Sequence, residues 1–381
     1  MQLSTVWFSN TSAILQGQLP DPLPPKVSKL TGRPILQRLI RHMKIQSLVL
    51  GATLLALTAP ARADHMGPSG VGSGGGQFVF GPETLDEGHA SLGFRLTYTR
   101  PERRSDADLE ALAGQGIGAH NTDYNLNASV GAAYGITHHL TFSTELPYVR
   151  RADLREGGEG LVERLGSISG VGDLNILAKY RLTRGDGIGL AIVAGIKLPT
   201  GSTHRRGPDG ERLETEHQPG TGSWDPIFGA SAGTKAGPFQ ISASALYQAS
   251  GKGAQRTQLG DRLQGGIALS HHFAPTAHHD AELSRNHHHG DELDEHAEGH
   301  AGSSWDAFME LSGEWEGRQR IGDQVEDASG GKSIWLTPGA RFNSAGGFSF
   351  GASLGLPMWQ RIRASHPDNN YRLSFSVGRT F

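Results

Sequence analysis

Residues 348–356 read FSFGASLGL, and every second residue of this stretch is apolar. Successive side chains of a β-strand point to opposite faces of the sheet, so the pattern places Phe348, Phe350 and Leu354 on one face and small polar residues on the other. Residues 239–247 (FQISASALY) repeat the pattern. Alternation of this kind indicates strands with one apolar and one polar face.

The same alternation recurs along most of the chain. Each predicted strand has about ten residues, the length that a tilted strand needs to cross a bilayer. The sequence therefore predicts an all-β, transmembrane, up-and-down antiparallel β-barrel of about twelve strands. We place these strands at residues 92–98, 124–134, 140–146, 174–180, 188–198, 224–234, 239–249, 259–271, 305–316, 333–342, 348–358 and 371–381.

Connections of two kinds alternate between these strands. Outer-membrane barrels have short periplasmic turns and longer external loops, so this asymmetry supports the topology. We predict short turns at 135–139, 183–187, 235–238 and 343–347 and longer polar loops at 100–122, 150–171, 199–223, 317–332 and 359–370. The connection at 273–304 falls on the short-turn side but is long and rich in histidine.

The region before the barrel contains an export signal. Residues 45–60 (IQSLVLGATLLALTAP) are apolar, follow Arg41 and Lys44, and precede the small-residue pattern of Ala61 to Ala63. This order predicts a cleaved signal peptide at 43–63, with export to the outer membrane of a Gram-negative cell. A retained anchor is the alternative, although the stretch is short for a spanning helix.

The remaining domain limits follow from this assignment. Residues 1–42 are expected to be an over-extended, disordered start. Residues 64–86 are rich in glycine and lack periodicity, so we predict a flexible periplasmic N-terminal tether there. The barrel then occupies 87–381, with a His-rich periplasmic insert at 273–304.

Composition excludes several classes of function. The chain has 381 residues, no cysteine and a formal net charge of −3, so no disulfide, thiolate site or basic nucleic-acid footprint is expected. The glycine-rich residues 69–76 lack the Lys-Ser/Thr ending of a phosphate-binding loop. No Ser-His or Asp-His pair stands in a recognisable catalytic setting, so we predict no enzyme. A soluble periplasmic all-β protein is the alternative fold.

Several short motifs carry a family resemblance. Residues 134–140 (YGITHHL), 197–201 (KLPTG) and 218–225 (QPGTGSWD) resemble members of the family named for the MetA pathway of phenol degradation. The resemblance extends over nearly the whole chain after the signal peptide. It implies an outer-membrane channel or transporter linked to the uptake of small organic compounds.

Polar residues on the strand face opposite the lipid are candidates for a solute path. Charges of both signs on an inward face set the field inside a pore. A closed barrel with opposite charges paired across the lumen is the alternative. The candidates are Arg95, Asn125, Asn127, Glu145, Lys179, Lys197, Glu310, Glu314, Arg341 and Arg372.

The His-rich insert interleaves imidazoles with carboxylates. Neutral imidazole suits Zn, Cu and Ni, so we predict capture of a divalent metal there, although no cofactor is required. The alternative is a solvated turn without such a function. The candidate ligands are His278, His279, His287, His288, His289, His296 and His300.

The last residue, Phe381, ends an alternating strand. A terminal aromatic of this kind resembles the signal that the outer-membrane assembly machinery reads, so this machinery, outer-membrane lipid and a small solute are the expected partners. The sequence thus predicts a channel for passive passage of small solutes, organic or aromatic ones included. A metal-linked outer-membrane protein and a structural or adhesive barrel are the alternatives.

Overall fold

The structure is a computed structural model that describes residues 76–158, 160–183, 187–273 and 302–381. The predicted signal peptide, the residues before it and the seven candidate histidines of the insert lie outside these residues.

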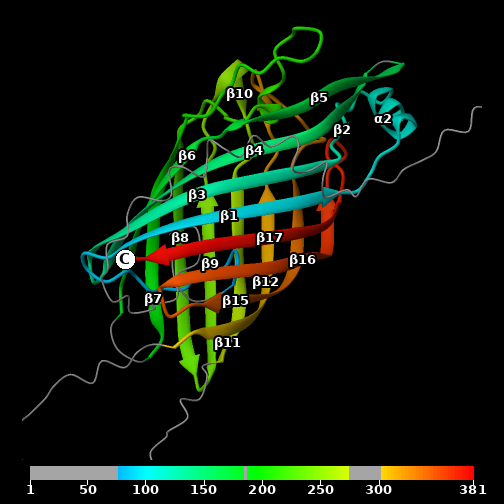
Figure 1. The fold of residues 1–381 in the computed structure, drawn as a ribbon. Coiled ribbons are helices and arrows are strands. Elements are labelled where there is room, and N and C mark those ends of the chain that lie inside the picture. Colours follow the sequence, from blue (N-terminus) through cyan, green and yellow to red (C-terminus); the bar gives the residue numbers. More distant parts are fainter. Residues whose placement is uncertain (1–75, 159, 184–186, 274–301) are drawn as a thin grey trace, which may run out of the picture. The chain divides into compact units, whose positions relative to one another are not determined.

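The described chain forms a closed, antiparallel β-barrel of twelve strands, which confirms the predicted fold. Each strand pairs with its neighbour in sequence, and β1 pairs with β17 to complete the ring. Figure 1 shows these strands side by side. They are β1 (Ala90–Pro101), β3 (Tyr124–Thr137), β4 (Leu140–Gly158), β6 (Leu174–Arg181), β7 (Gly189–Leu198), β8 (Asp225–Ala236), β9 (Phe239–Gln248), β11 (Arg262–Phe273), β12 (Ser304–Glu316), β15 (Gly331–Asn343), β16 (Phe348–Ile362) and β17 (Asn369–Thr380).

Burial alternates along the strands as the sequence pattern requires. In β12, Trp305, Met309 and Leu311 are exposed, whereas Phe308 and Glu310 between them are buried. Exposed apolar side chains on the other strands continue this outer surface. An apolar outer face and a polar inner face are the arrangement of a barrel that lies in lipid.

Strand β4 corrects the predicted loop at 150–171. It has 19 residues and pairs first with β6 and then with β5 (Leu161–Val171). Residues Gly172 and Asp173 separate β5 from β6. The far part of this hairpin runs past the end of the neighbouring strand β3, where no lipid demands an apolar face. Its sequence therefore lacks the alternation that marks the other strands.

The longer connections carry further short elements at the same end as β5, which we call the loop end (Figure 1). The opposite end, with the connections 138–139, 237–238 and 344–347, is the turn end. None of the described helices is long and apolar enough to cross a membrane. The loop-end elements are α2 (Asp106–Ala113), β2 (His120–Asn121), η2 (Thr215–His217), η3 (Ala254–Arg256), β10 (Thr257–Gln258), β13 (Arg320–Ile321) and β14 (Gln324–Val325).

The outer face of β12 predicts a sharp intolerance of charge. We expect Leu311→Arg to lower the free energy of unfolding in lipid by about 2–4 kcal/mol, because the guanidinium would lie in the apolar belt. Urea titration of the barrel refolded in vesicles measures the loss. Ile321→Arg is the control, since Ile321 is similarly exposed (43% against 51% for Leu311) but lies in the β13–β14 hairpin. Equal losses at both positions would contradict a lipid-facing β12.

Candidate functional site in the barrel lumen

Residues 76–86 lie inside the barrel, and we call them the plug segment. The backbone N–H groups of Phe78 and Val79 donate to Glu310 Oε2 on β12, at 2.8 and 3.1 Å. The carbonyl oxygen of Gly81 accepts from Lys179 Nζ on β6 at 3.3 Å and from Ser231 Oγ on β8 at 3.1 Å. The segment is thus fastened to inward side chains on several strands.

This placement differs from the predicted flexible tether at 64–86. The described part of that stretch is largely buried: Val79 and Leu85 are 3% and 4% exposed. The glycine-rich sequence has no periodicity, and its hydrogen-bond partners lie up to 265 positions away in the chain. Neither property leaves a signal in the local sequence.

Inward-facing glycines make room for the plug segment. A Cβ at Gly189 would lie 2.6 Å from Pro82 Cγ, and one at Gly233 would lie 2.8 Å from Pro82 Cδ. A Cβ at Gly135 would lie 2.1 Å from the carbonyl oxygen of Asp86. Real Cβ atoms do not approach this closely, so the barrel wall has no side chain where the segment passes.

The lumen holds the aromatic rings of the plug segment against cations. The guanidinium groups of Arg95 and Arg372 lie 5.6 and 5.1 Å from the centroid of the Phe78 ring. The Lys179 ammonium lies 6.0 Å from the centroid of the Phe80 ring. Cations within about 6 Å of a ring centroid are attracted by the negative π face.

The Phe80 ring also enters an apolar patch on the inner wall. It packs with Leu177, Val193 and Ile227, and Leu246 lies against this cluster. These residues come from the neighbouring strands β6, β7, β8 and β9. The lumen therefore combines charged groups with a small apolar surface, which is the usual composition of a small-molecule site.

Five of the ten predicted solute-path residues contact the plug segment. Glu310, Lys179, Arg95 and Arg372 do so as described, and Arg341 Nη2 donates to the carbonyl oxygen of Gly76 at 3.3 Å. Arg372 also forms a bidentate ion pair with Glu314, a sixth predicted residue. Its Nη1 and Nη2 donate to Glu314 Oε1 and Oε2 at 2.8 and 3.2 Å. The structure brings these six residues together around the plug segment.

The other four predicted residues lie in different surroundings. Lys197 is buried in a separate network, 3.0 Å from Asp173 and 2.8 Å from Asp225. The Asn125 side chain accepts a hydrogen bond from Thr122. Glu145 is half-buried and interacts electrostatically with Arg95. Asn127 is exposed on the inward face, so the lumen is not filled beside it.

The strongest additions to the predicted site are Phe78, Phe80 and Pro82, which sequence reasoning missed. The available signal was the set of glycines on the inward faces of the strands. A glycine inside a strand weakens the strand, so it often marks a place where another backbone approaches closely. At the C-terminus, the Phe381 N–H donates to the Ala90 carbonyl at 2.8 Å, so the last residue extends the seam between β17 and β1. Its role as an assembly signal stays a prediction.

Comparisons with known proteins agree with this architecture. Residues 113–308 match the model of a family described as "Putative MetA-pathway of phenol degradation". A search of curated proteins found no match. The chain is similar to the crystal structure of an outer membrane channel from Pseudomonas putida F1, with 17% identity over 78% of this chain and 97% of that chain and a TM-score of 0.51. This likeness shows the fold.

Two other solved barrels are less similar. The β domain of the Bordetella autotransporter BrkA is 10% identical over 78% of this chain and all of that chain, with a TM-score of 0.41. The deletion mutant of the TodX monoaromatic hydrocarbon channel is 10% identical over 78% of this chain and 91% of that chain, with a TM-score of 0.35. With TM-scores below 0.5, neither adds to the β-barrel fold that the Pseudomonas structure shares with this chain.

Removal of the Glu310 carboxylate should loosen the plug segment. A hydrogen bond to a charged group contributes about 1.5–3 kcal/mol and Glu310 accepts two, so we expect Glu310→Ala to raise the fraction of barrels with an open lumen by at least about 10- to 100-fold. Single-channel recording in planar bilayers measures this fraction. Glu316→Ala is the control, because Glu316 lies on the same face of β12 but pairs with Arg262 at the loop end. Unchanged recordings for Glu310→Ala would show that its carboxylate does not hold the barrel closed.

Proposed function

The chain belongs to the MetA-pathway of phenol degradation family, and on this premise we propose that it is an outer-membrane channel for passive passage of small organic solutes, aromatic compounds among them. The plug segment is its gate. The channel carries out no covalent chemistry on the solute.

The observation that carries the proposal is that the lumen already binds two aromatic rings. Phe78 lies against two guanidinium groups, and Phe80 lies between an ammonium group and an apolar patch. A small aromatic solute offers the same π face and the same apolar edge. The groups that bind these rings can therefore bind such a solute when the plug segment moves away.

The mode of attachment suits a gate. Among the described residues, the barrel sheet includes no strand from the plug segment. Its attachments are contacts with its rings and hydrogen bonds that each involve a side chain, either of the barrel or of the segment. A few such bonds hold a segment by several kcal/mol in total, roughly the range in which conformational equilibria respond to a ligand. A solute that competes for the ring sites would thus favour the open state.

The length of the connections sets the orientation. Short turns of outer-membrane barrels face the periplasm, and longer loops face the exterior. The plug segment joins β1 at the turn end, beside Gly135 and the His138 carbonyl, which accepts a hydrogen bond from Thr84. In this orientation the plug segment enters the lumen from the periplasmic end, and a solute from outside meets the loops first.

The two alternative functions remain predictions. Metal capture by the insert concerns residues that lie outside the described part of the chain. A structural or adhesive barrel would keep the plug segment in place permanently. The channel proposal requires that it move, and this difference can be tested directly.

The absence of cysteine allows the plug segment to be locked by an introduced disulfide. A side chain at position 189 would begin 3.4 Å from the Cβ of Pro82, and bridged cysteines have Cβ atoms about 3.5–4.5 Å apart. With Pro82→Cys/Gly189→Cys in porin-deficient cells, we expect uptake of labelled phenol to fall about tenfold on oxidation and to recover on reduction, because gate opening limits passage.

The two single-cysteine variants are the controls, since they alter the same contacts without forming a bridge. A labelled sugar measured in parallel separates a preference for aromatic solutes from general diffusion. If the oxidised double variant takes up phenol as fast as the reduced one, the plug segment is not the gate. If no form takes up phenol faster than cells without the protein, the channel proposal itself is wrong.

A further inference from the structure

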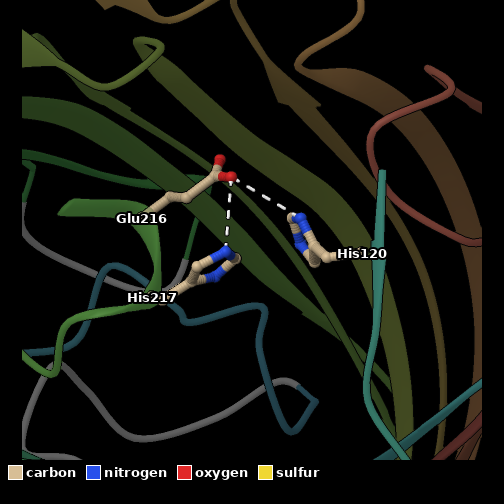
Figure 2. A group of neighbouring side chains, drawn as sticks. All are labelled: His120, Glu216 and His217. Carbon is tan, nitrogen blue, oxygen red and sulfur yellow. Dashed lines mark ion pairs between the residues drawn. The ribbon is translucent and has the colours of Figure 1, made fainter. Parts of the chain in front are cut away.

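Three histidines from separate loops converge at the loop end. His120 is in β2, His217 is in η2, and His366 lies between β16 and β17. The ring centroids of His120 and His217 are 4.5 Å apart, and those of His120 and His366 are 4.4 Å apart. Figure 2 shows the His120 and His217 rings directed at the Glu216 carboxylate. The cluster lies outside the lumen contacts that hold the plug segment.

Two ring nitrogens in this cluster are buried without a hydrogen-bond partner. They are His120 Nδ1 and His217 Nε2, on side chains that are only 10% and 2% exposed. Burial of a polar atom without a partner is unfavourable, commonly by about 1–3 kcal/mol. Both atoms face the same oxygen, Glu216 Oε1, so a single ligand bound beside this oxygen could satisfy both nitrogens.

The distances are too long for hydrogen bonds and suit ligands that share an ion. Glu216 Oε1 lies 3.5 Å from His120 Nδ1 and 3.8 Å from His217 Nε2. Hydrogen bonds to nitrogen span about 2.7–3.2 Å. Two ligands of a tetrahedral Zn²⁺, each about 2.0–2.1 Å from the metal, lie roughly 3.3–3.4 Å apart. All three ligand atoms are within 4.8 Å of one another.

Further carboxylates surround this point. Glu156 Oε2 lies 3.7 Å from His217 Nε2, and Glu156, Glu214 and His217 form a second group with ligand atoms within 4.8 Å. Arg151 contacts the cluster through the backbone, since its guanidinium donates to the carbonyl oxygen of His217 at 3.4 Å. Three carboxylates thus converge on one side of Arg151, and together they outnumber its single positive charge, which favours a divalent cation.

We propose that His120 Nδ1, His217 Nε2 and Glu216 bind one Zn²⁺ ion, with the Glu156 carboxylate as the fourth ligand. Two imidazoles with carboxylates form a donor set that zinc accepts. His366 is a positioning residue: it packs edge-on against His120, and its Nδ1 is hydrogen-bonded to Ser365 Oγ at 2.8 Å. The site is distinct from the predicted metal ligands at 278–300.

The ion would join the 199–224 connection, which contains Glu216 and His217, to the barrel sheet. His120 in β2 and Glu156 in the extended part of β4 already lie opposite each other in that sheet. A single ion bound to all four side chains would tie the connection to this β2–β4 pair. The loop end would then be fixed in one arrangement when zinc is bound and free to rearrange when it is not.

The test is a calorimetric titration of the full chain, refolded in detergent and purified without a histidine tag, with Zn²⁺. The seven insert histidines are first replaced by Gln, so that they do not bind the metal. We expect one Zn²⁺ per chain in this background, and a loss of affinity of at least about 100-fold with His217→Gln. His138→Gln is the matched control, because His138 is a 71% exposed histidine at the turn end.

A background protein that binds no Zn²⁺, or a His217→Gln variant that binds as well as its parent, would overturn the proposal. The heat-modifiable shift on gels shows whether each variant is folded. Cobalt absorption of the folded background is a second test that needs no further variant. Intense tetrahedral bands support the site, and the weak spectrum of octahedral Co²⁺ contradicts it. Neither test depends on whether the barrel conducts solutes.

Discussion

The pairing of β1 with β17 is the constraint on which the rest of the structure depends. In lipid, an unpaired backbone N–H or C=O costs several kcal/mol, so a sheet that crosses the membrane has to close on itself. The register runs from Ser91 opposite Thr380 to Pro101 opposite Asn369, and Phe381 adds a further bond to Ala90. Closure fixes which side chains face inward, and these create both the lumen and the attachments of the plug segment.

The same physical requirement explains how far sequence reasoning could go. A strand in lipid needs an apolar outer face, so each of the twelve strands is recognisable in the sequence by alternating apolar and polar residues. The far part of β4 and all of β5 do not face lipid in this way, so the sequence predicts a loop there. The inward position of Glu310 and Arg372 followed from alternation alone. What these side chains bind did not, because Phe78 lies more than 230 positions before Glu310.

The cluster at the loop end was beyond the reach of sequence for a related reason. His120, His217 and His366 are separated by about a hundred residues or more and lie in connections without periodicity. The insert is visible in the sequence because its seven histidines are crowded into residues 278–300. Convergence of distant loops depends on the curvature of the closed sheet and on contacts such as Arg155 with Asn121, which local patterns do not encode.

The inward glycines have a consequence for the way in which solutes would be discriminated. Where Pro82 now lies, Gly189 and Gly233 present only main chain. Once the segment had withdrawn, a departing molecule would meet peptide groups there, which differ little from one residue to the next. This exit would therefore select solutes by their size alone. Chemical discrimination would then rest with the positions of the Phe78 and Phe80 rings, and changes in preference during evolution would be concentrated in the side chains around them.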